Sequence, residues 1–534
     1  MTEGVTRREW LTRVGAVAAI TAAGSLSARA AESSAPIAET TFGRVRGAID
    51  DGILVFKGIP YGGPTGTRRF RPAADPQPWT GVRDALAYGP AAPQMPSALF
   101  TDKATSEDCL VLNVWTPALA DRGKRPIMVW LHGGGFSTLS GSSPMYDGVN
   151  LCKRGDVVVV TLNHRLNVFG FLHLGDLVGG EYAESGNVGM LDIVQALRWV
   201  QRNAAAFGGD ASNVTIFGES GGGRKVSTLL AMPAAQGLFH RAIIQSGPGL
   251  HLQPRDLATA VAEAFLKAMG ETPATIARLD TARPEALLKA CEFIENGFDQ
   301  GARSRGRVEQ RGFVPTVGTA TLPRFAFDPA ATEISADVPV MIGTNRHEMA
   351  LFARGDKEIY DRTLTEDALR GRLGPLVGGA TDRVMEVYSR LYPNADPAVR
   401  WILMTSDRTY RGDSITLAQR RAALGRGATF MYLFEWRSLA DPKLLAHHGL
   451  EIAFAFDNAT KVTTWSGGGA TAAALADKMS EAWLAFARTG NPATPKLPTW
   501  PAYTAATRAT MRFDDECALA NDPDAEVRRL WATI

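Results

Sequence analysis

A serine lies between glycines where a predicted strand meets a predicted helix. The run GESGG at residues 218–222 follows the apolar stretch 214–217 and precedes a helix-like segment, 226–232. This G-x-S-x-G spacing is typical of a sharp strand-to-helix turn, because glycines two residues before and after the serine remove side chains that would collide there. The motif alone is weak in a chain with 54 glycines, but the flanking strand and helix strengthen it. We interpret Ser220 as a candidate nucleophile rather than an inert serine of a glycine-rich loop.

A second glycine cluster, HGGGF at residues 132–136, ends the continuous apolar run 126–131. Such a run suits a strand buried on both faces of a mostly parallel sheet. The N–H groups of Gly134, Gly135 and Gly221 are candidate donors to the oxyanion that forms when a serine attacks a carbonyl, because residues without side chains let a substrate oxygen approach closely. The alternative is a flexible glycine turn, which the preceding strand argues against.

Strand-like and helix-like segments alternate through this region. Apolar runs at 156–163, 214–217 and 242–245 predict buried strands, and residues 191–207 predict a helix. This alternation predicts a doubly wound α/β sheet, in which reactive groups gather at the carboxyl ends of the strands. We interpret the helix-rich stretches 254–331 and 355–425 as insertions that roof the active site.

A candidate acid and a candidate base follow the serine in the chain. Glu348 lies just after the predicted strand that begins at residue 340, and the loop 446–451 carries His447 and His448, two of only eight histidines. Serine, acid, histidine is the order used by α/β-hydrolases.

Composition excludes several classes of partner. The chain of 534 residues has a formal net charge of +2, and without residues 1–30 its basic and acidic residues balance. A balanced charge provides no broad basic surface for nucleic acid or an anionic membrane. No apolar stretch of about 20 residues is present, so we expect no stable membrane insertion.

The N-terminus resembles a secretory signal. Arg7-Arg8 precede an apolar run, 14–23, and the small-x-small sequence Ala28-Arg29-Ala30. We expect residues 1–30 to be a twin-arginine-type signal peptide and the mature protein to be periplasmic or secreted. The alternative is a disordered basic tail on a cytoplasmic enzyme.

The four cysteines, Cys109, Cys152, Cys291 and Cys517, allow two disulfides in an exported protein. Twin-arginine cargo folds in the reducing cytoplasm first, so we expect mostly free, buried thiols. No cysteine has the spacing of a metal site.

Several segments in order resemble the type-B carboxylesterases, the family of para-nitrobenzyl esterases and cholinesterases. The resemblance runs from about residue 38 to 515. It rests on 56–61, 106–115, the glycine loop 132–136, 187–210, the serine turn and 483–490. It implies the α/β-hydrolase fold, with a large, mostly parallel sheet flanked by helices, and residues 31–534 as one catalytic domain. The implied reaction is hydrolysis of a small-molecule carboxylic ester, with no metal or organic cofactor.

The resemblance also assigns roles. Ser220 is the implied nucleophile, His448 the general base and Glu348 the orienting acid of a two-step acyl-enzyme mechanism. His448 is preferred to His447 because the family's histidine precedes Gly-x-Glu, here 449–451; we expect His447 to face solvent. Glu348 departs from the usual Asp-Glu-Gly context. Glu107 and Arg165 match positions that form a structural ion pair in the family.

Other positions differ from the relatives. Ala92 replaces a cysteine that many relatives bridge to the counterpart of Cys109, and the loop 92–109 has no tryptophan for a choline cation, so we do not expect a choline-ester specialist. Gly221 stands where alanine is more usual.

Three residues beside this machinery, Glu219, Arg224 and Phe136, are candidate substrate contacts. The charges of Arg224 and Lys225 lie in a generally buried turn, where we expect an ion pair or a solvated edge. Our alternative hypothesis is that Arg224 recognises an acidic group on the ester.

Two other functions stay open. One is a non-catalytic binding module with an esterase-like fold, against which the complete triad argues. The other is an acyl hydrolase for amides, lactones or lipids, which shares the same machinery. The sequence does not identify the natural substrate or the oligomeric state.

Overall fold

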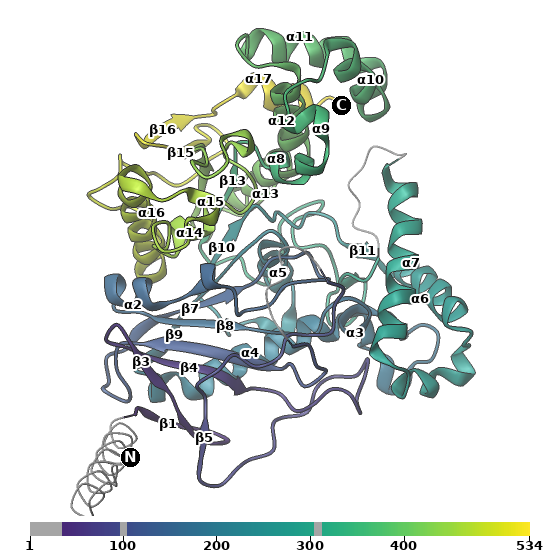
Figure 1. Cartoon of the computed structure of the whole chain (residues 1–534), viewed down its shortest axis with the longest axis vertical. Helices are drawn as coiled ribbons and strands as arrows, with labels where there is room; N and C mark the ends of the chain where they lie inside the picture. The colour runs from purple at the N-terminus through teal and green to yellow at the C-terminus, as the bar shows by residue number, and fades with distance from the viewer. Residues whose placement is uncertain (1–34, 97–103, 304–311) are drawn as a thin grey trace, which may run out of the picture.

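The computed structural model describes residues 35–96, 104–303 and 312–534 (Figure 1). The expected signal segment, residues 1–30, lies outside the described residues. Figure 1 shows a central sheet with helices on both sides, and a second group of helices above one end of it.

One large sheet organises the chain. Its strand order is β16-β15-β14-β13-β10-β9-β7-β8-β6-β4-β3. Pairing is parallel from β8 through β15, and antiparallel at both edges. The mostly parallel sheet predicted from the sequence is therefore confirmed. The strands are β3 (Ala48–Asp50), β4 (Ile53–Pro60), β6 (Val111–Thr116), β7 (Arg125–Leu131), β8 (Val158–Leu162), β9 (Gly209–Glu219), β10 (Arg241–Gln245), β13 (Val340–Asn345), β14 (Thr429–Phe434), β15 (Ala509–Phe513) and β16 (Ala518–Asn521).

Two smaller sheets complete the strands. One is formed by β1 (Ile37–Thr40), β2 (Gly43–Arg46) and β5 (Val82–Asp84), and the other by β11 (Gln253–Pro254) and β12 (Thr316–Val317).

Alternate residues of β7 enter different cores, which explains its continuous apolar run. Val129 and Leu131 belong to the core on one face of the sheet, whereas Met128 and Trp130 belong to the core on the other. Side chains alternate across a strand, so a strand covered on both faces needs apolar residues at every position.

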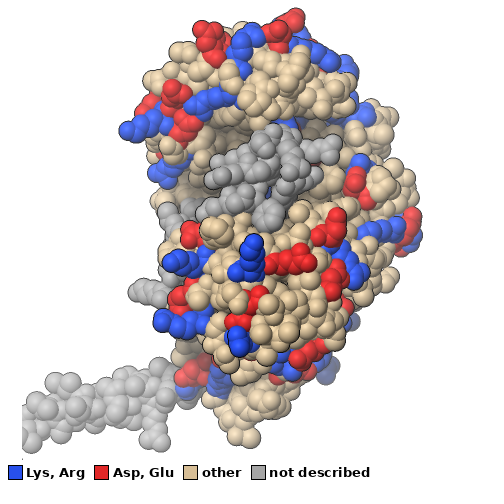
Figure 2. Space-filling model, turned by 90° about the vertical axis from the view of Figure 1, so that its right-hand side faces the viewer, with Lys and Arg blue, Asp and Glu red and all other residues tan. Residues whose placement is uncertain are grey.

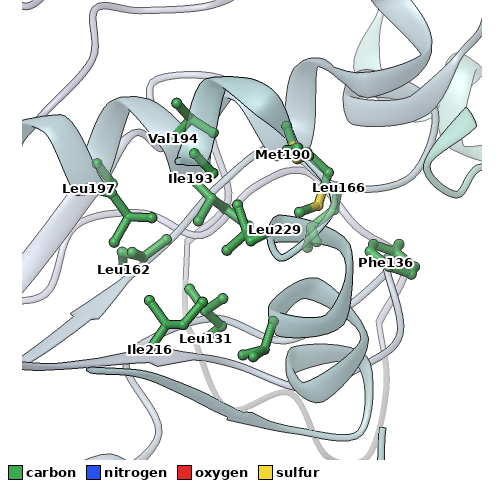
Figure 3. Packing of buried hydrophobic residues seen from close by; sticks show 14 of the residues in the cluster. Leu131, Phe136, Leu162, Leu166, Met190, Ile193, Val194, Leu197, Ile216 and Leu229 are labelled. Carbon is green, nitrogen blue, oxygen red and sulfur yellow. The ribbon is translucent and has the colours of Figure 1, made fainter. Parts of the chain in front are cut away.

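Helices α4 (Val188–Asn203) and α5 (Gly221–Leu229) cover the first of these faces. Figure 3 shows Ile193 and Leu197 directed toward Leu131, Leu162 and Ile216 of the strands. Each such side chain contributes roughly 1.5–3 kcal/mol on full burial. Helices α2 (Val149–Gly155) and α16 (Gly469–Thr489) contribute to the core on the opposite face.

Several element boundaries differ from the sequence prediction, among them the starts of β9, α5 and α4. Strand β9 begins at Gly209 rather than 214. Its first residues are mostly not apolar and are only partly buried, so the apolar pattern did not include them. Helix α5 begins at Gly221, immediately after the serine, rather than at 226. Helix α4 begins at Val188 rather than 191.

The two helix-rich stretches contain most of the remaining helices. Figure 1 shows α6 and α7 beside the sheet, and α10, α11 and α12 above it with the C-terminal α17. That these helices roof the active site stays a prediction. The bounds are α3 (Asn167–Phe171), α6 (Arg255–Met269), α7 (Pro284–Arg303), α8 (Met349–Phe352), α9 (Lys357–Tyr360), α10 (Glu366–Val377), α11 (Thr381–Leu391), α12 (Pro397–Ser406), α13 (Gly412–Ala422), α14 (Ile452–Ala455), α15 (Thr463–Ser466) and α17 (Ala525–Trp531).

Acidic and basic side chains are interspersed on the face seen in Figure 2. Among the described residues, no helix combines the length and apolar character needed to cross a bilayer.

Candidate active site

Ser220 occupies the sharp turn between β9 and α5. Its backbone has φ 56° and ψ −120°, a conformation that a residue with a side chain rarely adopts and that costs on the order of 1–3 kcal/mol. The Ser220 N–H donates to the carbonyl of Gln245 at 2.8 Å, which holds the turn against the end of β10. The strained turn therefore presents the serine at the carboxyl end of the sheet, as the motif predicts.

Gly218 and Gly222 are required because a larger residue would collide with the neighbouring backbone, not because the chain needs flexibility there. A Cβ atom on Gly222 would lie 1.9 Å from the carbonyl oxygen of Leu131, and one on Gly218 would lie 2.6 Å from the same atom. Both distances are far below van der Waals contact with a backbone that cannot move aside. Helix α5, which we call the elbow helix because it follows the sharp turn at Ser220, thus packs directly against the end of β7.

Glu348 and His448 form a buried acid–base pair. The His448 Nδ1 atom lies 2.6 Å from Glu348 Oε2, and the two side chains are 5% and 0% exposed. The other carboxylate oxygen of Glu348 accepts hydrogen bonds from Ser246 Oγ at 2.6 Å and from the Asn345 N–H at 2.8 Å. These two donors fix the carboxylate, so the glutamate fixes the orientation of the imidazole.

The second nitrogen of His448 is free to act on the serine. Its Nε2 atom forms no hydrogen bond with any described residue, although Glu219 Oε1 lies 3.1 Å from it, and His448 and Ser220 line the same cavity. The rings of Phe352 and Tyr410 each lie 4.9 Å from the His448 ring, centroid to centroid. Tyr410 belongs to a short π-helical turn, η9 (Asp407–Arg411), a feature often found at functional sites.

Sequence reasoning missed four of these supporting residues: Ser246, Asn345, Phe352 and Tyr410. Ser246 and Asn345 lie at the carboxyl ends of β10 and β13, where the rule for open α/β sheets could have found them. No comparable signal points to Phe352 or Tyr410.

The glycine loop, residues 132–136, lies against the turn that carries Ser220. Gly134 and Gly135 have φ angles of 78° and 61°, in the region that favours glycine. A Cβ on Gly221 would lie 2.1 Å from the Gly135 carbonyl oxygen. The N–H groups of Gly134 and Gly135 donate to no other described residue. The loop can therefore offer free donors beside Ser220, which is what an oxyanion hole requires.

A cavity of about 290 Å³ opens onto Ser220 and His448. Most of its wall is apolar or formed by glycine, and the apolar side chains are Leu139, Met145, Tyr146, Leu351, Phe352, Ile452 and Trp465. This volume and lining suit a small, largely uncharged molecule.

Glu219 lines the cavity, but Phe136 does not. The Phe136 side chain is 1% exposed and its ring packs edge-on against Phe171 at 5.2 Å. Figure 3 shows it at the edge of the core cluster. The turn of the glycine loop directs the Phe136 ring into the core, so the ring packs there and supports the loop rather than contacting substrate.

Three buried carboxyl groups, those of Glu219, Glu348 and Glu451, interact electrostatically near His448. Burial and the charge of Glu348 raise the pKa of Glu219 well above its usual value, and the positive charge of Arg224 opposes this rise. Burial and the neighbouring carboxylates raise the pKa of Glu451 to about 8. The Glu451 carboxyl accepts a hydrogen bond from Asn345 Nδ2 at 2.6 Å. Extra negative charge near Glu348 and His448 is therefore suppressed near neutral pH.

The predicted Glu107–Arg165 ion pair is wrong. Arg165 instead pairs with Asp192 of α4 through two bonds of 2.6 and 2.8 Å. Glu107 pairs with Arg69, whose Nε lies 2.7 Å from Oε2. The fold brings α4, not the segment around residue 107, against the end of β8.

Two predictions about charged residues also need correction. His447 does not face solvent: it is 1% exposed, and burial lowers its pKa to about 4. Lys225 is fully buried and pairs with no carboxylate among the described residues, so it is neither an ion-pair member nor a solvated edge. Arg224 is partly buried, and its side chain makes no hydrogen bond or ion pair within the described part of the chain.

The thiols behave as expected. None of the four cysteines forms a disulfide; Cys109, Cys152 and Cys291 are buried and Cys517 is partly exposed. Within the described ranges, no group of three or more histidine, cysteine or acidic side chains could hold a metal ion.

Comparison with known proteins adds independent evidence. The chain matches the model of the carboxylesterase family over residues 34–531. It is 37% identical to para-nitrobenzyl esterase of Bacillus subtilis (strain 168), covering 92% of this chain and 98% of that protein. It is 34% identical to phenmedipham hydrolase of Pseudarthrobacter oxydans, covering 92% and 97%. A solved carboxylesterase of Geobacillus stearothermophilus superposes with a TM-score of 0.81 at 40% identity, covering 93% of this chain and 99% of that one.

Proposed function

Because this chain belongs to the carboxylesterase family and is a carboxylic ester hydrolase, we propose that Ser220, His448 and Glu348 form its catalytic triad. The observation that carries this proposal is the 2.6 Å hydrogen bond between Glu348 and His448, whose side chain lines the same cavity as Ser220. The free Nε2 of His448 gives the serine a base.

The reaction proceeds in two steps. His448 Nε2 takes the Ser220 proton as Oγ attacks the ester carbonyl carbon, and the N–H groups of the glycine loop and Gly221 stabilise the oxyanion. The carbon–oxygen bond to the alcohol breaks, and the alcohol leaves with that proton. Water then loses a proton to His448 and attacks the acyl-enzyme, which releases the acid and restores Ser220. Glu348 keeps the imidazole in the productive tautomer throughout.

The shape and lining of the cavity favour small esters with an apolar or aromatic part. Its volume of about 290 Å³ and its apolar side chains, such as Leu139 and Trp465, support this substrate class. The relative named para-nitrobenzyl esterase points to p-nitrobenzyl esters as test substrates.

The test is hydrolysis of p-nitrobenzyl and p-nitrophenyl esters by the wild type and by Ser220→Ala. Turnover that disappears in a folded Ser220→Ala variant supports the proposal. Full turnover in that variant overturns it.

We also propose that Arg224 receives an acidic group carried by some ester substrates. Its guanidinium forms no hydrogen bond or ion pair within the described residues, and its charge acts on Glu219, Tyr410 and Asp413. Arg224 follows Ser220 by four residues and is not among the residues that line the cavity. A partly buried cation without an ion-pair partner can bind a carboxylate through charge-assisted hydrogen bonds.

Export to the periplasm or the medium remains our proposal for localisation. The twin-arginine pattern at Arg7-Arg8 and the small-x-small sequence at 28–30 support it. Fusion of residues 1–30 to a reporter tests it: loss of export on replacement of both arginines by lysine supports the proposal, and retention of the unaltered fusion in the cytoplasm contradicts it.

A further inference from the structure

Lys225 connects the elbow helix to the glycine loop. It lies in α5, five positions after Ser220, and its side chain is 0% exposed. Its Nζ donates a hydrogen bond to the His132 carbonyl oxygen at 2.8 Å and lies 5.6 Å from the centre of the Phe136 ring. The amine thus lies near both ends of the HGGGF loop, and Lys225 is not among the residues that line the cavity.

No negative charge compensates this amine. Lys225 forms no ion pair with a described residue, and its charge acts on two histidines, His132 and His164. Burial, together with the Lys225 charge, holds the pKa of both histidines well below the usual value, so they are neutral. Their rings stack at 5.1 Å, and each Nδ1 contacts a backbone carbonyl.

A buried ammonium without a counter-ion is costly for stability. Burial lowers the pKa of Lys225 to about 7, which leaves the amine partly charged under neutral conditions. A methionine of similar length would fill the same space without this cost. The side chain therefore has a role that packing does not explain.

We propose that Lys225 is a positioning residue of the oxyanion hole: it anchors the His132 carbonyl, and its ammonium charge favours the negative charge that develops on the substrate oxygen. This inference rests on the proposed triad mechanism. The hydrogen bond fixes the first peptide of the loop, so the following N–H groups face Ser220. The charge acts through the loop and not by contact with the substrate, so its effect is smaller than that of a direct donor.

The inference predicts a specific dependence on pH. Elements β7, β9 and β10 pack against α5. His132 follows β7 and Glu219 ends β9, and both are titratable. His164 and Arg165 follow the neighbouring strand β8. In β10, Arg241 lies at the opposite end of the strand and Gln245 at the carboxyl end is neutral. None of these forms an ion pair with Lys225. As pH rises through about 7, the ammonium loses its proton and no longer stabilises the negative charge on the substrate oxygen.

The experiment compares the wild type with Lys225→Met on p-nitrophenyl acetate from pH 5.5 to 8.5. We expect kcat to fall about tenfold at low pH with KM nearly unchanged, less than the ~10²–10³-fold loss on removal of a direct oxyanion donor. The ratio of wild-type to variant kcat should decline above pH 8 to a smaller, constant value, because the neutral amine still donates to the His132 carbonyl but no longer carries a charge. The ratio cancels any dependence on pH that both enzymes share.

A trifluoromethyl ketone, which forms an oxyanion on Ser220, gives a second readout: its inhibition constant should rise by the same factor as kcat falls. Thr228→Val, on the same helix and also buried, is the matched control and should give a ratio independent of pH. Lys225→Gln keeps a donor without charge and replaces the methionine variant if that does not fold; it should give the same dependence on pH.

A ratio that is constant with pH, an effect confined to KM, or unchanged kcat overturns the inference. The proposed triad is tested separately by Ser220→Ala. An inactive Ser220→Ala together with a flat Lys225→Met ratio removes only the role of the lysine.

Discussion

The carboxylate of Glu219 lies 3.1 Å from His448 Nε2, the ring nitrogen opposite the one bound to Glu348. The imidazole is therefore flanked by two buried carboxyl groups with different surroundings. Glu348 accepts two further hydrogen bonds, whereas Glu219 Oε1 accepts none in the described structure. Burial raises the pKa of Glu219, which suppresses the carboxylate form that would stabilise a proton on Nε2.

Glu348→Gln should abolish most activity without unfolding the protein. Ser246 and the Asn345 N–H both donate to one oxygen of Glu348, so the new carbonyl should stay there and the amide NH₂ should face His448 Nδ1. This selects the tautomer with its proton on Nε2, which cannot accept the serine proton. We expect kcat to fall by roughly 10³–10⁴, as for the corresponding change in serine proteases. A folded variant with kcat within tenfold of wild type, checked by thermal unfolding, contradicts this role.

Gly221→Ala should damage the oxyanion hole. The added Cβ would lie 2.1 Å from the carbonyl oxygen and 2.5 Å from the nitrogen of Gly135, so the glycine loop must move. We expect a loss of about 10² in kcat, comparable to loss of one oxyanion donor. Gly371→Ala in α10 is the control, because its Cβ meets no atom within 4 Å. Equal kcat values for both variants would show that the loop is not packed as described.

Arg224→Ala should weaken binding of a carboxylated ester alone. The free guanidinium can form charge-assisted hydrogen bonds worth roughly 1.5–3 kcal/mol, so KM for p-nitrophenyl hemisuccinate should rise about tenfold or more. KM for the neutral p-nitrophenyl butyrate should stay near the wild-type value. Arg198→Ala, which changes an exposed arginine of α4, controls for net charge. Equal changes on both esters would remove Arg224 from substrate recognition.

Lys225→Met should stabilise the protein in a pH-dependent way. Burial lowers the folded-state pKa of Lys225 from 10.5 to about 7, so between these values the unfolded chain binds one more proton than the folded one. Wild-type stability therefore rises with pH through this window. The gain from Lys225→Met should be largest below pH 7, at about 1.4 kcal/mol for each pH unit of the window as an order of magnitude, and should shrink toward pH 10.

Urea unfolding of both proteins at pH 6, 8 and 9.5 measures this difference. A gain that is constant across pH, or a variant less stable than wild type at pH 6, would show that the lysine is not a buried cation without a partner.

The sequence points to two members of the proposed triad because each belongs to a local pattern. Ser220 has its flanking glycines, and His448 has the Gly-x-Glu that follows it. The sheet was equally predictable, since strands such as β7 are apolar at every position when both faces are covered.

Long-range partners were not predictable in the same way. Which carboxylate meets Arg165 depends on how α4 packs at the end of β8, and the pattern around residue 107 carries no information on that. Lys225 illustrates the same limit: its charge predicts a solvated or paired side chain, but the close packing of the elbow helix on the glycine loop buries it. Phe136 adjoins the glycine loop in sequence, but the turn of that loop directs its ring into the core.

The most direct test of the account is the site of covalent modification by a fluorophosphonate, measured by peptide mass spectrometry on the folded protein. The account predicts one adduct, on Ser220, that is absent from Ser220→Ala and greatly slowed in Glu348→Gln. An adduct on another residue, or no adduct on a protein that still hydrolyses esters, would contradict Ser220 as the nucleophile.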